Sequence, residues 1–179
     1  MPTYIAFLRA INLGAKRKFP KGDIVTATQA AGGSDVLTHI NTGNVRLLIK
    51  RRTRAGVETD LETAYLAQTG FEVPTVAFTA AELAQIAAQA RDLDASAPDL
   101  ERHYIYLLKD HPEPARVAAL EGKAHGSDRA FVQGRAAHVL FGPGYQAGKV
   151  DPFAVEKTLG VVATNRNRNV VCTLAEKWC

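Results

Sequence analysis

The segment Val36-Leu-Thr-His-Ile-Asn-Thr-Gly-Asn-Val-Arg-Leu-Leu-Ile49 decides the fold, because it contains two short apolar runs separated by a turn. Aliphatic and β-branched residues fill 36–40 and 45–49, which is typical of strands. The intervening Asn41-Thr-Gly-Asn44 has the composition of a tight hairpin turn. We therefore predict that the two strands pair antiparallel.

The hairpin is flanked on each side by a strand and a helix. The predicted elements are a strand over 3–9, a helix over 20–31, a helix over 57–68 and a strand over 73–78. The helices show apolar residues at helical spacing and end at glycines, whereas the strands are short runs without a breaker. The order βαββαβ predicts a four-stranded antiparallel sheet with both helices on one face.

The remaining chain repeats this order in a degenerate form. Thr79-Ala-Ala-Glu82 has the form of a capping box and predicts a helix that runs to about Arg91. The next residues, 92–99, lack periodicity. Further elements are predicted as a strand over 104–109, a helix over 112–120, strands over 130–133 and 136–141, a helix over 151–159, a strand over 161–163 and a helix over 167–178.

We therefore predict an α+β protein of two ferredoxin-like (βαββαβ) subdomains with antiparallel sheets. The first subdomain and its connecting helix span 1–91, a linker spans 92–102, and the second subdomain spans 103–179. The second copy is degenerate and ends in a C-terminal helix.

Basic residues are concentrated in the first part of the chain. Residues 1–54 contain ten lysines and arginines against two acidic residues, whereas the remainder contains 12 basic and 16 acidic residues. This asymmetry indicates that the first part faces an anion, which could be a phosphate, a nucleic acid or an acidic partner. The alternative is a basic surface that is simply solvated.

Several sites of known chemistry are not supported. The stretch from Gly142 to Val150 fails as a phosphate-binding loop, because Pro143 stands at the first glycine position and Val150 lacks a hydroxyl. His125-Gly-Ser-Asp128 contains the residue types of a catalytic triad, but adjacent residues rarely assemble one, so a polar turn is the simpler interpretation.

The composition also limits cofactors and location. The five histidines lack metal-binding spacing, neither cysteine belongs to a C-x-x-C pair, and no acid–base pair can be named, so we predict no metal and no cofactor and leave catalytic residues unassigned. No apolar run is long enough to span a bilayer. We expect a cytoplasmic protein without a membrane partner.

Three stretches together resemble one known family. They are Tyr4-Ile-Ala-Phe-Leu-Arg-Ala-Ile-Asn-Leu-Gly-Ala-Lys16, Thr38-His-Ile-Asn-Thr-Gly-Asn-Val45 and Thr164-Asn-Arg-Asn-Arg-Asn169. They are similar to Y-I-A-L-L-R-G-I-N-V-G-G, Y-I-Q-S-G-N-V and T-T-R-N-W-N-T-V in the family numbered 1697 in the domain-of-unknown-function series. The chain departs from these patterns at Ala10, Ala15, Asn41, Thr42, Arg168 and Val170. The resemblance implies two ferredoxin-like subdomains and an activity that is unassigned.

The three stretches share a physical feature, since each places arginine or asparagine beside a glycine or a chain turn. If they converge, these hydrogen-bond donors could hold a phosphate or a carboxylate. The candidate ligand-binding residues are Arg9, Asn12, Lys16, Asn41, Thr42, Asn44, Arg166, Asn167 and Asn169. The alternative is structural, with the asparagines shaping a hairpin or capping the last helix and the arginines joining the two halves.

Three functional hypotheses follow. The first is a binding module for an anionic small molecule or nucleic acid, centred on the basic segments 9–21 and 50–54. The second is an enzyme that acts on a small phosphorylated or carboxylated substrate through Arg9 and Arg166. The third is a structural protein that forms a homo-oligomer through exposed sheet surfaces.

Overall fold

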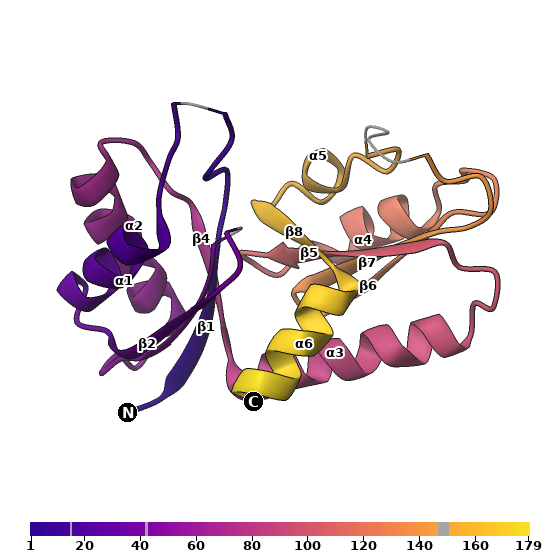
Figure 1. Ribbon diagram of the computed structural model, residues 1–179. Helices are drawn as coiled ribbons and strands as arrows, with labels where there is room; N and C mark the ends of the chain where they lie inside the picture. The colour runs from indigo at the N-terminus through magenta and orange to yellow at the C-terminus, as the bar shows by residue number, and fades with distance from the viewer. Residues whose placement is uncertain (15, 42, 147–150) are drawn as a thin grey trace. The chain divides into compact units, whose positions relative to one another are not determined.

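The residues that predict a hairpin form β2 (Ser34–His39) and β3 (Asn44–Leu48), which pair antiparallel with Thr38 opposite Val45. The computed structural model describes residues 1–14, 16–41, 43–146 and 151–179 (Figure 1). The described chain forms two units, which we call the N-terminal unit (1–83 with 176–179) and the C-terminal unit (84–175).

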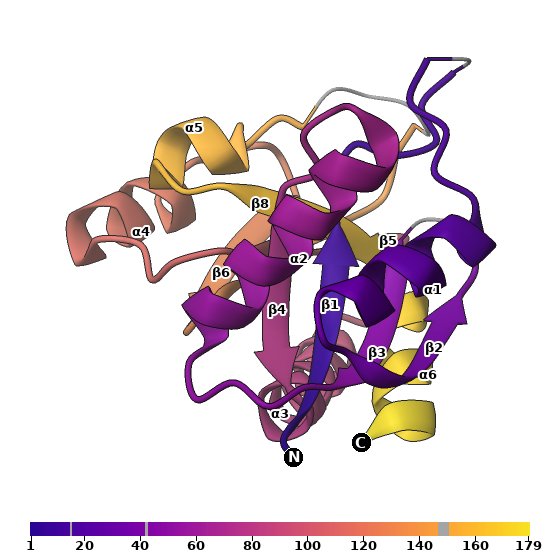
Figure 2. The same cartoon turned by 90° about the vertical axis from the view of Figure 1, so that its left-hand side faces the viewer.

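The N-terminal unit has the predicted βαββαβ order. Around the hairpin lie β1 (Thr3–Leu8), α1 (Lys21–Ala30), α2 (Arg54–Thr69) and β4 (Thr75–Thr79). The strands form one antiparallel sheet in the order β2-β3-β1-β4, and Figure 2 shows α1 and α2 on the same face of it. This confirms the ferredoxin-like topology that the hairpin predicts.

The core of this unit follows the period-two alternation of β1. Tyr4, Ala6 and Leu8 belong to the buried cluster that also contains Leu61 and Tyr65 of α2. The hydroxyls of Tyr65 and Thr28 are 2.8 Å apart, and burial raises the pKa of Tyr65. The helices therefore pack against this face of the sheet, and the buried hydroxyl of Tyr65 has a hydrogen-bond partner.

The C-terminal unit repeats the topology. It contains β5 (Arg102–Leu108), α4 (Pro114–Glu121), β6 (Arg129–Gln133), β7 (Ala136–Phe141), α5 (Val155–Leu159) and β8 (Ala163–Asn167). The sheet order is β6-β7-β5-β8, which matches the order in the first unit position by position. In Figure 1, α4 and α5 lie on one face of this sheet, whereas α3 (Ala80–Ala95) and α6 (Arg168–Trp178) lie on the other.

Two boundaries differ from those expected from the sequence. Helix α3 continues to Ala95, four residues into the expected linker, and the division between the units falls within this helix at Leu83/Ala84 rather than at residue 91. Strand β8 covers 163–167 instead of 161–163, because residues 163–167 pair with β5 from Leu108 to Tyr104. The third family stretch therefore begins on a strand.

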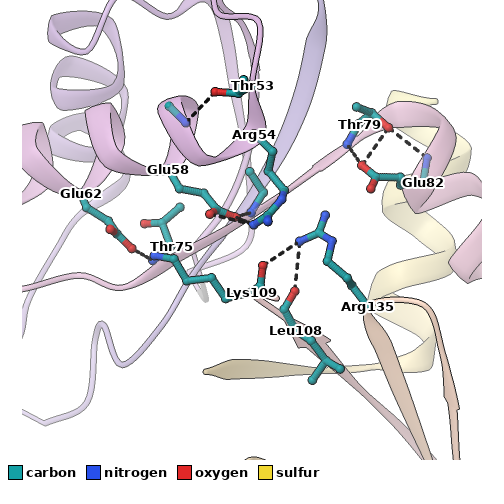
Figure 3. Close-up of polar contacts among 12 residues, drawn as sticks. Thr53, Arg54, Glu58, Glu62, Thr75, Thr79, Glu82, Leu108, Lys109 and Arg135 are labelled. Atoms are coloured by element: carbon teal, nitrogen blue, oxygen red, sulfur yellow. Dashed lines mark hydrogen bonds and ion pairs between the residues drawn. The ribbon is translucent and has the colours of Figure 1, made fainter. Parts of the chain in front are cut away.

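In both units the last strand runs directly into a helix, and a polar side chain caps the junction. The Thr79 hydroxyl accepts from the amide of Glu82 at 3.2 Å, while the Glu82 carboxylate accepts from the Thr79 amide at 2.7 Å (Figure 3). At the start of α6, the Asn167 side chain accepts from the amide of Asn169 at 2.8 Å. The predicted capping box is thus confirmed, and Asn167 has the capping role that was the structural alternative.

We expect Thr79→Ala to lower the free energy of unfolding by about 1 kcal/mol, because it removes the acceptor for a helix-terminal amide. Urea denaturation followed by circular dichroism measures this loss. Thr63→Ala is the matched control, since the Thr63 hydroxyl only donates to the Thr59 carbonyl within α2. An equal loss in both variants would contradict the capping role.

Glutamates cover the outward amides of three edge strands. The carboxylates of Glu62 and Glu58 accept from the amides of Thr75 and Ala77 on β4, at 2.8 and 2.9 Å (Figure 3). Glu121 accepts from Val132 on β6 at 2.8 Å, and Glu156 accepts from Ala163 on β8 at 2.9 Å. These amides are therefore occupied, which disfavours the addition of another strand at these edges.

Candidate anion-binding site

The loop between β1 and α1 is tied to the hairpin by Asn12. Its side-chain amide donates to the Asn41 carbonyl at 2.8 Å and to the Phe19 carbonyl at 3.3 Å, and its side-chain oxygen accepts from the Phe19 amide at 2.9 Å. The Asn12 backbone amide donates to the Arg17 carbonyl at 2.7 Å. The first two family stretches therefore meet at one end of the sheet, and Asn12 holds them together.

Arg17 anchors the other side of this loop and was not among the residues predicted to form the site. Its guanidinium donates to the carbonyls of Ala10 at 2.7 Å and Glu72 at 2.6 Å, and it lies 4.5 Å from the centre of the Phe71 ring. Nothing in the local sequence pattern indicates this contact, because Phe71 and Glu72 are more than fifty residues away in the chain. Arg17 therefore fixes the loop while adding a positive charge to it.

The hairpin turn is shaped by buried contacts. Asn44 is fully buried and donates from its side chain to the His39 carbonyl at 3.0 Å, while the Gly43 carbonyl accepts from the Leu8 amide at 2.8 Å. Asn41 is exposed, and its carbonyl is the acceptor for Asn12. Thr42 lies outside the described residues. Among these residues, Asn44 thus has the structural role of closing the hairpin.

Backbone strain gathers at this same end of the sheet. Ala10, Asn12 and Ile40 have φ angles of 56°, 55° and 51°, and the two glycines Gly14 and Gly43 are also in the left-handed region. A positive φ is unfavourable for side chains with a Cβ, above all for β-branched isoleucine. Such strain concentrates at functional sites, so it favours a functional site at this end of the sheet.

The loop is also strongly basic. Residues 9–22 include five cationic residues and no carboxylate. The cations are Arg9, Lys16, Arg17, Lys18 and Lys21. The side chains of Lys16, Lys18 and Lys21 are exposed, and Arg9 is half-buried with its backbone amide bonded to Pro74 at 2.9 Å. The positive end of the α1 dipole adds to this charge, because α1 begins at Lys21.

The second basic segment does not join this surface. Leu48 at the end of β3 pairs with Thr3 at the start of β1, so residues 50–54 lie at the opposite end of the sheet from the loop that follows Leu8. There, Arg51 donates to Asp60 at 2.8 Å. Arg54 pairs with the buried Glu58 at 2.9 Å, as Figure 3 shows. The two basic segments therefore lie at opposite ends of the sheet and do not form one continuous surface.

The third family stretch belongs to the C-terminal unit. The Arg166 guanidinium donates to the Thr164 hydroxyl at 2.9 Å and to the Asn165 carbonyl at 2.7 Å, and burial lowers the pKa of Arg166 to about 10. Asn167 caps α6, and the exposed Asn169 accepts from Arg168 at 3.3 Å. These hydrogen bonds of Arg166 lie within β8, whereas that of Asn167 serves the strand-to-helix junction.

A buried chain of titratable groups in the same unit was missed by the sequence analysis. Asp94 Oδ1 lies 2.6 Å from His103 Nδ1, and His103 Nε2 lies 3.0 Å from His138 Nδ1. Burial lowers the pKa of both histidines, that of His138 to about 3. Arg168 Nε is 2.7 Å from Asp94 Oδ2 but is not oriented to donate to it.

In the part of the chain that is described, no cluster of ligating side chains could hold a metal ion.

Comparisons with known proteins agree with the fold. The chain shares 18% sequence identity with the conserved bacterial protein SP0830 from Streptococcus pneumoniae, with a TM-score of 0.72 over 99% of this chain and 98% of that one. No curated protein matches the chain. Within the described residues, no helix has the length and apolarity needed to cross a membrane.

The family comparison covers the first two stretches. The family described as "Protein of unknown function (DUF1697)" matches residues 1–138, which include the basic loop and the hairpin, whereas the third stretch lies beyond the matched residues. Since the match spans more than half of the chain, this protein belongs to the DUF1697 family.

Proposed function

We propose that the protein is a cytoplasmic binding module for an anionic, phosphate-containing ligand, and that the loop between β1 and α1 is its binding surface. The observation that carries this proposal is the set of five cations in residues 9–22, which contain no carboxylate. A surface whose charges all have the same sign attracts ligands of the opposite charge and raises their association rate.

The loop is also preorganised. Asn12 and Arg17 hold its backbone through five side-chain hydrogen bonds to main-chain atoms, so the charged side chains project from a fixed frame. A fixed frame reduces the entropy lost on binding. Asn12 and Asn44 thus serve the proposed site by shaping it, whereas Lys16, Lys18 and Lys21 are exposed to contact the ligand.

We expect Lys16→Glu with Lys18→Glu to weaken binding of a fluorescein-labelled single-stranded oligonucleotide and of pyrophosphate at least about tenfold at low ionic strength, because two phosphate-facing charges are reversed. Fluorescence anisotropy and calorimetry measure these affinities. For the oligonucleotide, the logarithm of the affinity should fall linearly with the logarithm of the salt concentration.

Lys50→Glu with Arg52→Glu is the matched control. Both side chains are exposed, and the pair changes the net charge by the same amount at the opposite end of the sheet. The control variant should retain most of the affinity. The proposal fails if wild-type protein binds neither probe at low salt, or if the two double variants lose affinity equally.

A further inference from the structure

Two sequence stretches that carry no recognisable chemistry when taken separately meet beside the β6–β7 hairpin. The turn His125–Asp128 precedes β6, and Gly142–Tyr145 follows β7. Asp128 Oδ1 accepts from the Gly142 amide at 3.0 Å. A Cβ at position 142 would lie 2.3 Å from Ser127 Oγ, so glycine at this position permits the close approach of the two stretches.

The two stretches border a hollow of about 400 Å³, within the size range of small-molecule sites. Its lining includes His125, Ser127, Asp128, Phe141, Tyr145 and Pro152. A second hollow of about 320 Å³ shares Ser127 and Pro143 with the first, and one residue of each charge, Asp99 and Arg129, also lines it. Both hollows lie within the C-terminal unit and are distinct from the basic loop.

One wall of the first hollow is aromatic and is held in place. The rings of Phe141 and Tyr145 have centroids 4.9 Å apart, and the Tyr145 hydroxyl lies 3.3 Å from that of Tyr104. The carboxylate of Glu101 accepts from the amides of Gly144 at 3.2 Å and Tyr145 at 3.1 Å. The ring of Tyr145 is therefore positioned before any ligand arrives, which favours binding.

The remaining wall is polar. His125 presents its imidazole, whose ring packs edge-on at 5.1 Å from that of Phe153, and Ser127 and Asp128 present a hydroxyl and a carboxylate. Among the described residues, no lysine or arginine lines this hollow, and the carboxylate of Glu101 lies directly behind the loop. The described lining of the first hollow therefore carries a carboxylate and no cation, which disfavours an anion there.

We propose that this hollow binds an uncharged, hydroxylated ring of the saccharide class. The C–H face of such a ring packs against Tyr145 and Phe141, while its hydroxyls exchange hydrogen bonds with Ser127, Asp128 and His125. The second hollow gives room for a further ring. This inference does not depend on anion binding at the basic loop, because the two sites lie in different units and favour ligands of different charge.

Amide chemical shifts of the ¹⁵N-labelled full chain test the inference, with glucose, N-acetylglucosamine and glucose 6-phosphate as probes. We expect a saturable shift of the amides of 125–128 and of Gly142, Gly144 and Tyr145 with at least one uncharged sugar, and at least about fivefold weaker binding of glucose 6-phosphate there. Tyr145→Ala should weaken sugar binding at least about fivefold, whereas Tyr145→Phe should retain most of it because the ring remains.

Ser127→Ala provides a second variant at an exposed position, where folding is not at risk, and it should also weaken binding. The inference is overturned if neither uncharged sugar shifts these amides. It is also overturned if glucose 6-phosphate binds this hollow as tightly as glucose, or if both Tyr145→Ala and Ser127→Ala bind sugar as the wild type does.

Discussion

We expect Gly43→Ala to lower the free energy of unfolding by about 3 kcal/mol, combining unfavourable backbone geometry with steric overlap. Gly43 has a φ of +75°, and a Cβ there would lie 2.7 Å from Leu8 Cβ and 2.8 Å from Ile11 Cδ1. Both neighbours are buried core residues, so neither can move away freely. Urea denaturation followed by circular dichroism measures the loss.

Gly134→Ala is the matched control for the hairpin glycine. Gly134 also turns a β-hairpin with a positive φ, of +61°, but a Cβ there would meet no atom within 4 Å. Gly134→Ala should therefore lower the free energy of unfolding only through the unfavourable backbone conformation, by about 1 kcal/mol. If the two variants lost the same free energy of unfolding, the steric overlap of the new Cβ with Leu8 and Ile11 would make no contribution.

The order of elements could be predicted because each signal was local. The hairpin composition of 41–44, the capping box at Thr79 and Glu82, and the closing Gly70 each describe a few neighbouring residues. Strand β8 was predicted at 161–163 rather than 163–167, because residues 164–167 lack a strand-like pattern. Its conformation is set by pairing with β5, which is a tertiary effect.

The separation of the two basic segments was accessible from the predicted topology. In a βαββαβ unit the first strand and the strand that ends the hairpin run antiparallel, so residues that follow them emerge at opposite ends of the sheet. A count of charges along the chain does not contain this information. The pairing of Thr3 with Leu48 shows that the two segments are separated by the length of the sheet. Chain topology therefore has to be applied before charges are grouped into a surface.

Contacts in the candidate sites could be predicted from the sequence only where they lie within one predicted hairpin. The contact of Asp128 with Gly142 is compatible with the predicted hairpin that turns at Gly134, since continuing its register places residue 128 opposite 141, the neighbour of Gly142. No comparable signal places Arg17 on Phe71, or Asp94 beside His103, because those contacts join different elements. Side chains that act between elements become visible only when the elements are packed.

The buried chain of Asp94, His103 and His138 has a fixed direction of hydrogen bonding. The carboxylate of Asp94 can only accept, so His103 Nδ1 donates to it and His103 Nε2 is left to accept from His138 Nδ1. His138 Nε2 then carries a lone pair, and it has no hydrogen-bond partner among the described residues. His138 is therefore held as a neutral base in the protein interior.

The surroundings of His138 oppose its protonation. It is fully buried on β7 between β5 and β6, and His103 is the titratable group in direct contact with it. Beyond His103 lie Asp94 of α3 and Arg168 of α6, whose charges oppose each other. Arg166 of β8 pairs with Ile105, the residue that also pairs with His138, and adds a positive charge to the same row of the sheet.

We expect the free energy of unfolding to fall as the pH decreases from about 6.5 towards 3, by about 1.4 kcal/mol per pH unit from His138 alone. The pKa of His138 is lowered from 6.5 to about 3 in the folded protein, so in this window the unfolded chain binds a proton that the folded chain does not. The stability contributed by the neutral histidine is thus present above pH 6.5 and lost on acidification, with a total of about 5 kcal/mol.

Urea denaturation between pH 8 and 4 measures this dependence, and His138→Gln should show a shallower decline because the titrating group is removed. His111→Gln is the control, since the His111 side chain is exposed in the folded chain and its variant should follow the wild-type profile. Direct titration of the imidazole by NMR gives a second reading, in which His138 should stay neutral at pH 5. If His138 gained its proton near pH 6.5 in the folded protein, the interior would not disfavour its charged form, and the expected loss of stability on acidification would be contradicted.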